Sequence, residues 1–171
     1  MKVVSQRTHE LLVVGMLAVL GLACNGQPPS QNIAGDMTDA ERQAVITEVK
    51  TEAEAFFAST RSLDGAGVMA HFDSTETVYV VNAHEYSFET LKTDLADGFL
   101  GTLASWEGNW VQTQVWPLTP DAAVFHGTFD VRQTLRAGGT RTISGGHFTA
   151  LYRRRDGAWR MTHAHMSYVA H

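Results

Sequence analysis

The C-terminal half of the chain, after Ala104, consists of four strand-like runs separated by short turn signals. The runs are NWVQTQVWPL, AAVFHGTFDVRQTL, TRTISGGHFTALYRR and AWRMTHAHMSYV, and the breaks between them are TPD, RAGGT and RRDG. Runs rich in Val, Thr and aromatic residues, bounded by Gly, Pro and Asp, are typical of antiparallel strands joined by turns. We therefore expect a long meander, with SGG as a β-bulge inside its third run.

Helical signals come before this meander. The segment Thr38-Asp39-Ala40-Glu41 is a capping-box pattern. Apolar residues then recur at helical spacing up to an end near residues 59–63, namely Val45, Ile46, Val49, Ala53, Phe56 and Phe57. A break at residues 64–67 precedes a short second helix from Val68, and Ser87 can cap a third helix that runs to about residue 103.

One pair of short strands is expected between these helices. The run ETVYVVN, residues 76–82, is β-branched and aromatic, and AHEYSF continues it or forms a short partner. Helices followed by a meander indicate an α+β fold in which N-terminal helices pack on one face of a curved antiparallel sheet. Such a sheet leaves a concave face, and the helices close it into a cone with a cavity.

The first 36 residues are expected to lie outside this domain. Lys2 and Arg7 precede thirteen apolar or small residues, and the only cysteine, Cys24, follows Ala23 directly. This length is too short to span a bilayer and is typical of a signal-peptide core. The pattern resembles a bacterial lipobox, so we predict a lipoprotein signal peptide over residues 1–23, with Cys24 as the lipidated residue. An ordinary secretory signal is the alternative.

A polar segment links this signal to the domain. Residues 24–36 contain two prolines and few apolar side chains, which is typical of a flexible tether, and the folded domain is expected over residues 37–171. The chain would then be anchored by lipid in the cell envelope, on the periplasmic or extracellular side, or be secreted. The 171 residues carry a formal net charge of −5, which argues against nucleic acid as a main partner.

The order of elements and the closing run LYRRRDGAWRMTHAHMS resemble the nuclear transport factor 2-like superfamily. The SnoaL-like branch is most similar, and the motif matches the association domain of calcium/calmodulin-dependent protein kinase II. The residues that carry this match are Arg154, Arg155, Asp156, Gly157, Trp159, His163, His165 and Ser167. The resemblance implies a cone-shaped fold, a cavity for a small molecule and a homodimer. It implies no particular reaction, because one fold hosts many chemistries.

The alternation of side chains along a strand assigns the candidate residues to faces. Trp159, His163 and His165 share parity with one another and are opposite in parity to Arg160, so we expect both imidazoles to point into the cavity. The resemblance points Asp130 inward as well, whereas apolarity alone would choose the opposite face of that strand, which carries Phe125 and Phe129.

These faces suggest acid–base chemistry. Imidazoles exchange protons near neutral pH, and Asp130 could orient His163 or His165 as a His-Asp pair. The alternative is that both histidines are structural or line the pocket generically. A metal site that adds His126, His147 or Asp130 to the two histidines is another alternative, and neither a metal nor a cofactor is predicted.

An apolar wall for a ligand is the second set of candidates. The predicted ligand-binding residues are Tyr79, Trp110, His126 and Trp159. Ordinary packing in the core or at a dimer interface is the alternative for the aromatic members. Together these patterns predict a domain that binds a small, mostly apolar molecule. The alternatives are a cofactor-free isomerase, cyclase or hydratase-type enzyme and a homo-oligomeric assembly module.

Overall fold

The computed structural model describes residues 37–171, apart from the side chain at position 97. The predicted signal peptide, Cys24 and the tether lie outside the described residues.

The domain begins with α1 (Asp39–Arg61), and Thr38 caps this helix as predicted. The Thr38 hydroxyl accepts the Glu41 N–H at 3.2 Å, and the Glu41 carboxylate accepts the Thr38 N–H at 2.8 Å. The capping box therefore fixes where the first helix starts.

The segment after α1 is partly different from the expectation. The second helix, α2 (Gly65–Met69), starts three residues earlier than predicted, because Asp64 accepts the Gly67 N–H and acts as its cap. Next come β1 (Val78–Val81) and β2 (His84–Ser87), which form an antiparallel pair. Ser87 caps α3 (Phe88–Leu91) as expected, but the chain then continues as the π-helical η1 (Lys92–Phe99) and the short 3₁₀ turn η2 (Leu100–Thr102).

The four predicted strand-like runs form the long part of one six-stranded sheet. They are β3 (Leu103–Thr119), β4 (Ala122–Leu135), β5 (Thr140–Arg155) and β6 (Ala158–Ser167). The strand order is β2-β1-β6-β5-β4-β3, antiparallel throughout except for β1, which pairs in parallel with β6. This is the expected α+β plan with helices on a curved sheet.

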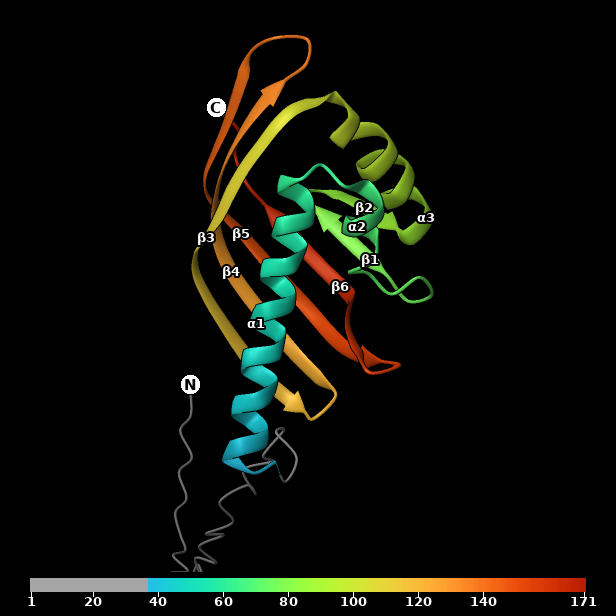
Figure 1. Ribbon diagram of the computed structural model, residues 1–171, viewed down its shortest axis with the longest axis vertical. Helices are drawn as coiled ribbons and strands as arrows, with labels where there is room; N and C mark the ends of the chain where they lie inside the picture. The colour runs from blue at the N-terminus through green and yellow to red at the C-terminus, as the bar shows by residue number, and fades with distance from the viewer. Residues whose placement is uncertain (1–36) are drawn as a thin grey trace, which may run out of the picture. The chain divides into compact units, whose positions relative to one another are not determined.

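One face of the sheet is covered by helices (Figure 1). The helix α1 lies across β3 to β6, while α2, α3 and η1 lie beside the β1–β2 end. We call the covered face the inner face and the opposite one the outer face. The core lies between α1 and the inner face, where aromatic rings from both sides meet, as when Phe57 stacks on Trp110 with 3.8 Å between ring centroids.

Besides the register shifts between β3 and β4, two β-bulges decide which side chains of β5 and β6 reach the inner face. At the first, Ser144 and Gly145 together oppose Asp130, between the pairs Phe129–Gly146 and Val131–Ile143. This is the bulge that the SGG sequence predicts. At the second, Thr162 is an extra residue on β6, between the pairs Leu151–His163 and Tyr152–Met161. A bulge of one residue reverses the alternation beyond it, so each moves a whole set of side chains to the other face.

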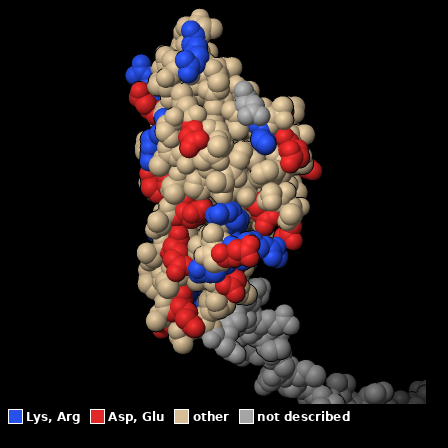
Figure 2. Space-filling model, turned by 45° about the vertical axis from the view of Figure 1, so that its right-hand side comes forward, with Lys and Arg blue, Asp and Glu red and all other residues tan. Residues whose placement is uncertain are grey.

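The surface of the domain mixes charges of both signs. Figure 2 shows acidic and basic side chains interspersed over the face in view, more densely on its lower part than on its upper part. Several charged side chains of the domain are paired, for example Arg155 with Asp73 and Glu76 and Arg154 with Glu48. Within residues 37–171, no helix is long and apolar enough to cross a membrane.

Candidate ligand-binding cavity

Two adjoining cavities lie under η1, between the sheet and the C-terminal segment. Both lie on the inner face of the sheet. We call the more enclosed one, of about 70 Å³, the inner cavity, and the other, of about 190 Å³, the outer cavity. Five residues line both of them: Tyr79, Leu95, Phe99, Met166 and Tyr168. The two cavities therefore share part of their wall.

The wall of the inner cavity is almost entirely apolar. It is built by α1, α2, η1 and the inner face of the sheet, and its side chains include Phe56, Phe57, Val68, Trp106, Phe129, Val131 and Ile143. The polar groups in this wall are the side chains of Thr60 and Gln133, which are both buried, and the hydroxyls of Tyr79 and Tyr168. The Thr60 hydroxyl donates to the Phe56 carbonyl at 2.9 Å, so its donor is already used.

Tyr79 is the predicted ligand-binding residue that the structure places in the cavity wall. It is buried on β1, and its hydroxyl donates to the Met166 sulfur at 3.6 Å. Burial raises the pKa of the Tyr79 phenol far above its usual value, so the group stays neutral. A neutral phenol keeps this part of the wall uncharged.

The prediction that His163 and His165 point into the cavity is wrong. Both side chains are exposed on the outer face, whereas Trp159 and Met161 on the same strand are buried. The reason is the bulge at Thr162, beyond which Ala164 and Met166 take the inward positions. The parity rule holds on each side of the bulge but not across it.

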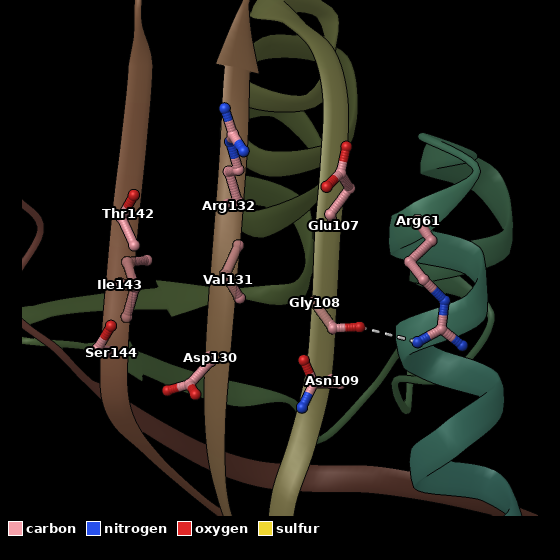
Figure 3. Close-up of a pocket in the computed structure, with 10 residues that line it drawn as sticks. All are labelled: Arg61, Glu107, Gly108, Asn109, Asp130, Val131, Arg132, Thr142, Ile143 and Ser144. Carbon is pink, nitrogen blue, oxygen red and sulfur yellow. Dashed lines mark hydrogen bonds between the residues drawn. The ribbon is translucent and has the colours of Figure 1, made fainter.

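Asp130 also lies on the outer face, so the inward placement that the resemblance implied is wrong. Apolarity alone would have chosen correctly, since Phe125 and Phe129 point inward and are buried. Asp130 lines a groove of about 430 Å³ that crosses β3, β4 and β5, together with Glu107, Arg132 and Ser144 (Figure 3). Its carboxylate accepts the Gly145 N–H at 2.8 Å and thereby satisfies the backbone of the first bulge.

The proposed His-Asp pair is not assembled in the structure. Asp130 is on β4 and the two histidines are on β6, with β5 between them. Two strand spacings amount to about 10 Å, which is too far for a hydrogen bond. Within residues 37–171 no group of three or more His, Cys, Asp or Glu side chains could hold a metal ion.

The other three predicted ligand-binding residues lie away from the two cavities. Trp159 is buried, donates its indole N–H to Glu48 at 2.9 Å and lies under the Arg154 guanidinium. Trp110 packs on Phe57 and donates to the Ala53 carbonyl at 3.3 Å. These contacts match the core-packing alternative.

His126 is on the outer face, where its ring stacks on His147 with 5.8 Å between centroids. Its Nδ1 lies 3.1 Å from the Thr149 hydroxyl. The outer face therefore carries four histidines, since His163 and His165 occupy the same side of the sheet.

The sequence reading missed one cluster of chemically capable groups. His71, after α2, lies with Nδ1 2.7 Å from the Glu52 carboxylate and Nε2 3.2 Å from the Ser59 hydroxyl. Glu52 and Ser59 are seven residues apart on α1 and share one face, a spacing that could have indicated the pair. The chain Ser59–His71–Glu52 lines neither of the two cavities, and it ties the α2 segment to α1.

Solved structures with the same architecture define the class of the fold. A nuclear transport factor 2-like superfamily protein from Salmonella enterica has a TM-score of 0.66 at 17% identity, covering 75% of this chain and 94% of its own. A hexachlorocyclohexane dehydrochlorinase has a TM-score of 0.67 at 14% identity, covering 78% and 92%. A Xanthomonas campestris protein assigned as a calcium/calmodulin-dependent protein kinase II association domain has 0.62 at 21% identity, covering 71% and 86%.

The fold is therefore nuclear transport factor 2-like. Residues 49–171 match the SnoaL-like domain family, and the chain belongs to that family. No curated protein matches the sequence.

Proposed function

We propose that this domain binds a small, mostly apolar molecule in the two adjoining cavities. The observation that carries the proposal is the shared wall of five residues between two cavities whose other side chains are largely aromatic and aliphatic. Concave sites with an apolar lining and few polar groups are the usual form of small-molecule sites. The two spaces together suit a ligand of the size of a bicyclic aromatic molecule.

Binding is better supported than acid–base catalysis. Among the described residues that line the two cavities there is no histidine, and the one carboxylate, Asp94, lines only the outer cavity. An isomerase, cyclase or hydratase needs a group that gives or takes a proton within reach of the substrate. His163, His165 and Asp130 are on the other side of the sheet and do not supply it.

A matched pair of substitutions on β4 tests the proposal. Val131 lines the inner cavity and Val124 is on the outer face of the same strand. Naphthalene is the probe, and its binding is measured by its fluorescence with the fragment that starts at Asn25. We expect Val131→Phe to fill the cavity and weaken binding at least tenfold, and Val124→Phe to leave it unchanged. Equal affinity in all three proteins, or no binding to the unchanged protein, would contradict the proposal.

The outer face of the sheet has the features of a surface that binds a second copy of the chain. It carries the four histidines and Trp116, which is 43% exposed, with Val78, Val80 and Leu151 at half-buried positions. Large exposed aromatic residues are enriched at protein interfaces. We propose a homodimer through this face, as the association-domain assignment of one structural relative also suggests.

Thr149 provides the test of this interface, because it is exposed at the centre of the outer face between His126 and His165. Thr149→Arg should convert the dimer into a monomer in light-scattering measurements. Thr140→Arg, at the start of β5, is the control and should leave the mass unchanged. An unchanged mass for Thr149→Arg would place the interface elsewhere.

The proposed location is the cell envelope, by export and a lipid anchor on Cys24. The support is the apolar run that ends in Ala23-Cys24 and the polar segment that follows. In a bacterial host, Cys24→Ser should move the protein from the membrane fraction to the soluble fraction. Continued membrane association of this variant would refute the anchor.

A further inference from the structure

The buried amide of Gln133 is the chemically unusual group in the cavity wall. Gln133 is on β4, opposite Trp106 on β3, and is only 4% exposed. Its neighbours on the inner face of β4 are Val131 and Phe129. The side chains that line the inner cavity with Gln133 are mostly apolar.

The side-chain oxygen of Gln133 has no hydrogen-bond partner among the described residues. Leaving a buried acceptor unpaired is unfavourable, and the large majority of buried polar groups in proteins are paired. The other polar groups of the inner wall do not satisfy it: the Thr60 hydroxyl donates to Phe56, the Tyr79 hydroxyl donates to Met166, and the Tyr168 hydroxyl makes no hydrogen bond to Gln133. The wall of the cavity therefore leaves this acceptor for something that enters it.

The unpaired oxygen of Gln133 differs from the other unpaired buried group, the hydroxyl of Tyr152, because it borders a cavity. The Tyr152 hydroxyl is also buried without a partner, but Tyr152 lines neither cavity and is fully enclosed by the core. Gln133 differs because it borders a space of about 70 Å³, and a water molecule has a share of about 30 Å³ in the liquid. The space thus admits more than one water, or a polar group at the end of a larger molecule.

Charge restricts what that molecule can be. The described residues that line the two cavities include no Lys, Arg or His, so nothing there compensates an anion. Burying an unpaired charge is much more unfavourable than burying a hydroxyl. The molecule that enters to the depth of Gln133 is therefore neutral at that end.

We infer that Gln133 selects neutral ligands that carry a hydroxyl or N–H group, such as a phenol or an alicyclic alcohol, with the donor pointing at its side-chain oxygen. This inference rests on the proposed function and assigns the chemical class of the ligand. The apolar body of the ligand lies against Phe57, Trp106 and the shared wall. The donor group enters first, towards β4.

Two probes with the same ring system, one with a hydroxyl and one with a methoxy group in its place, test this inference. 1-Naphthol donates a hydrogen bond, whereas 1-methoxynaphthalene has the same ring system and no donor. The unchanged protein should bind 1-naphthol about tenfold more tightly, because one hydrogen bond to a buried acceptor is worth about 1.4 kcal/mol or more. In Gln133→Leu the two probes should bind within about twofold of each other, with 1-methoxynaphthalene at least as tight as before.

A control variant and a measurement of thermal stability show whether Gln133→Leu is correctly folded. Gln112→Leu removes an exposed glutamine from the outer face of β3 and should preserve the tenfold preference. Gln133→Leu should melt a few degrees higher than the unchanged protein, because it removes an unpaired buried acceptor.

The outcomes separate the two claims. Naphthalene binding together with equal affinity for the two probes in the unchanged protein would overturn the role of Gln133 and leave the proposed function standing. A tenfold preference that survives Gln133→Leu would overturn it too. Failure of naphthalene and of both probes to bind would overturn the proposed function itself, and the inference with it.

Discussion

The two faces of the same four strands have opposite chemistry. The inner face presents aromatic and aliphatic side chains to α1 and the cavities, while the outer face presents His126, His147, His163 and His165 to the surface. Strand alternation alone would produce two faces, but the bulges decide which residues belong to which. The position of one extra residue, Thr162, is therefore as important for the cavity as any residue in its wall.

The largest expected effect comes from adjacent residues on β5 that point in opposite directions. Phe148 is 1% exposed and contacts Phe56, Trp110 and Phe125, whereas His147 is exposed. Phe148→Ala should lower the free energy of unfolding by about 4 kcal/mol, because it leaves a large void. His147→Ala should change it by less than about 0.5 kcal/mol. Urea unfolding of both variants measures the contrast, and similar losses would mean that the faces are assigned incorrectly.

The first bulge allows a second, smaller contrast between neighbouring glycines. A Cβ on Gly146 would lie 2.4 Å from the Phe129 ring, whereas a Cβ on Gly145 would meet nothing within 4 Å. Gly146→Ala should therefore destabilise the domain by about 2 kcal/mol through overpacking. Gly145→Ala should lose only about 1 kcal/mol, because its φ of +66° disfavours a side chain. Thermal melting of the two variants checks this order, and the reverse order would contradict the bulge geometry.

A third contrast concerns two carboxylates that each accept backbone N–H groups. Asp73 is 8% exposed, while Asp130 is exposed on the outer face. The Thr75 hydroxyl, the N–H groups of Thr75 and Glu76 and the nearby Arg155 hold the pKa of Asp73 below its usual range. Asp73→Asn should lower the free energy of unfolding by about 1.5 kcal/mol at pH 7. Asp130→Asn should have a smaller effect.

The sign of the pH dependence follows from the lowered pKa of Asp73. Its contribution is complete above the pKa of the unfolded chain, about 3.9, and disappears as the pH falls through the lower pKa of the folded state. The difference between the unchanged protein and Asp73→Asn should therefore shrink between pH 5 and pH 2. A difference that stays constant in urea titrations over this range would refute the role of the charged carboxylate.

Local signals predicted most of the fold. The capping box at Thr38, the cap at Ser87 and the turn and bulge signals of the meander all lie within a few residues of the features that they specify. The early start of α2 was not predicted, although the Asp64 cap that sets it is a local feature, and no sequence signal distinguished the π-helical η1 from an α-helix.

The site was less predictable than the fold. Tyr79 was predicted as an aromatic residue of an apolar wall, and it does line the two cavities. The faces of His163 and His165 were missed because no residue type marks Thr162 as an extra residue in a β-rich run. Gln133 was visible in the sequence, but its importance depends on the lack of a partner, which only the packed structure reveals.

The bulge at Thr162 also has a consequence for comparing members of the family. A relative that has the same residues but pairs them in regular alternation, with no bulge between the Trp and the two histidines, would keep the His-x-His motif and present both imidazoles to its cavity. Two proteins that align well over this motif could therefore differ in whether it touches a substrate. To decide whether the histidines of this motif face the cavity in a given protein, the register of β6 has to be known, because the sequence of the motif alone does not determine it.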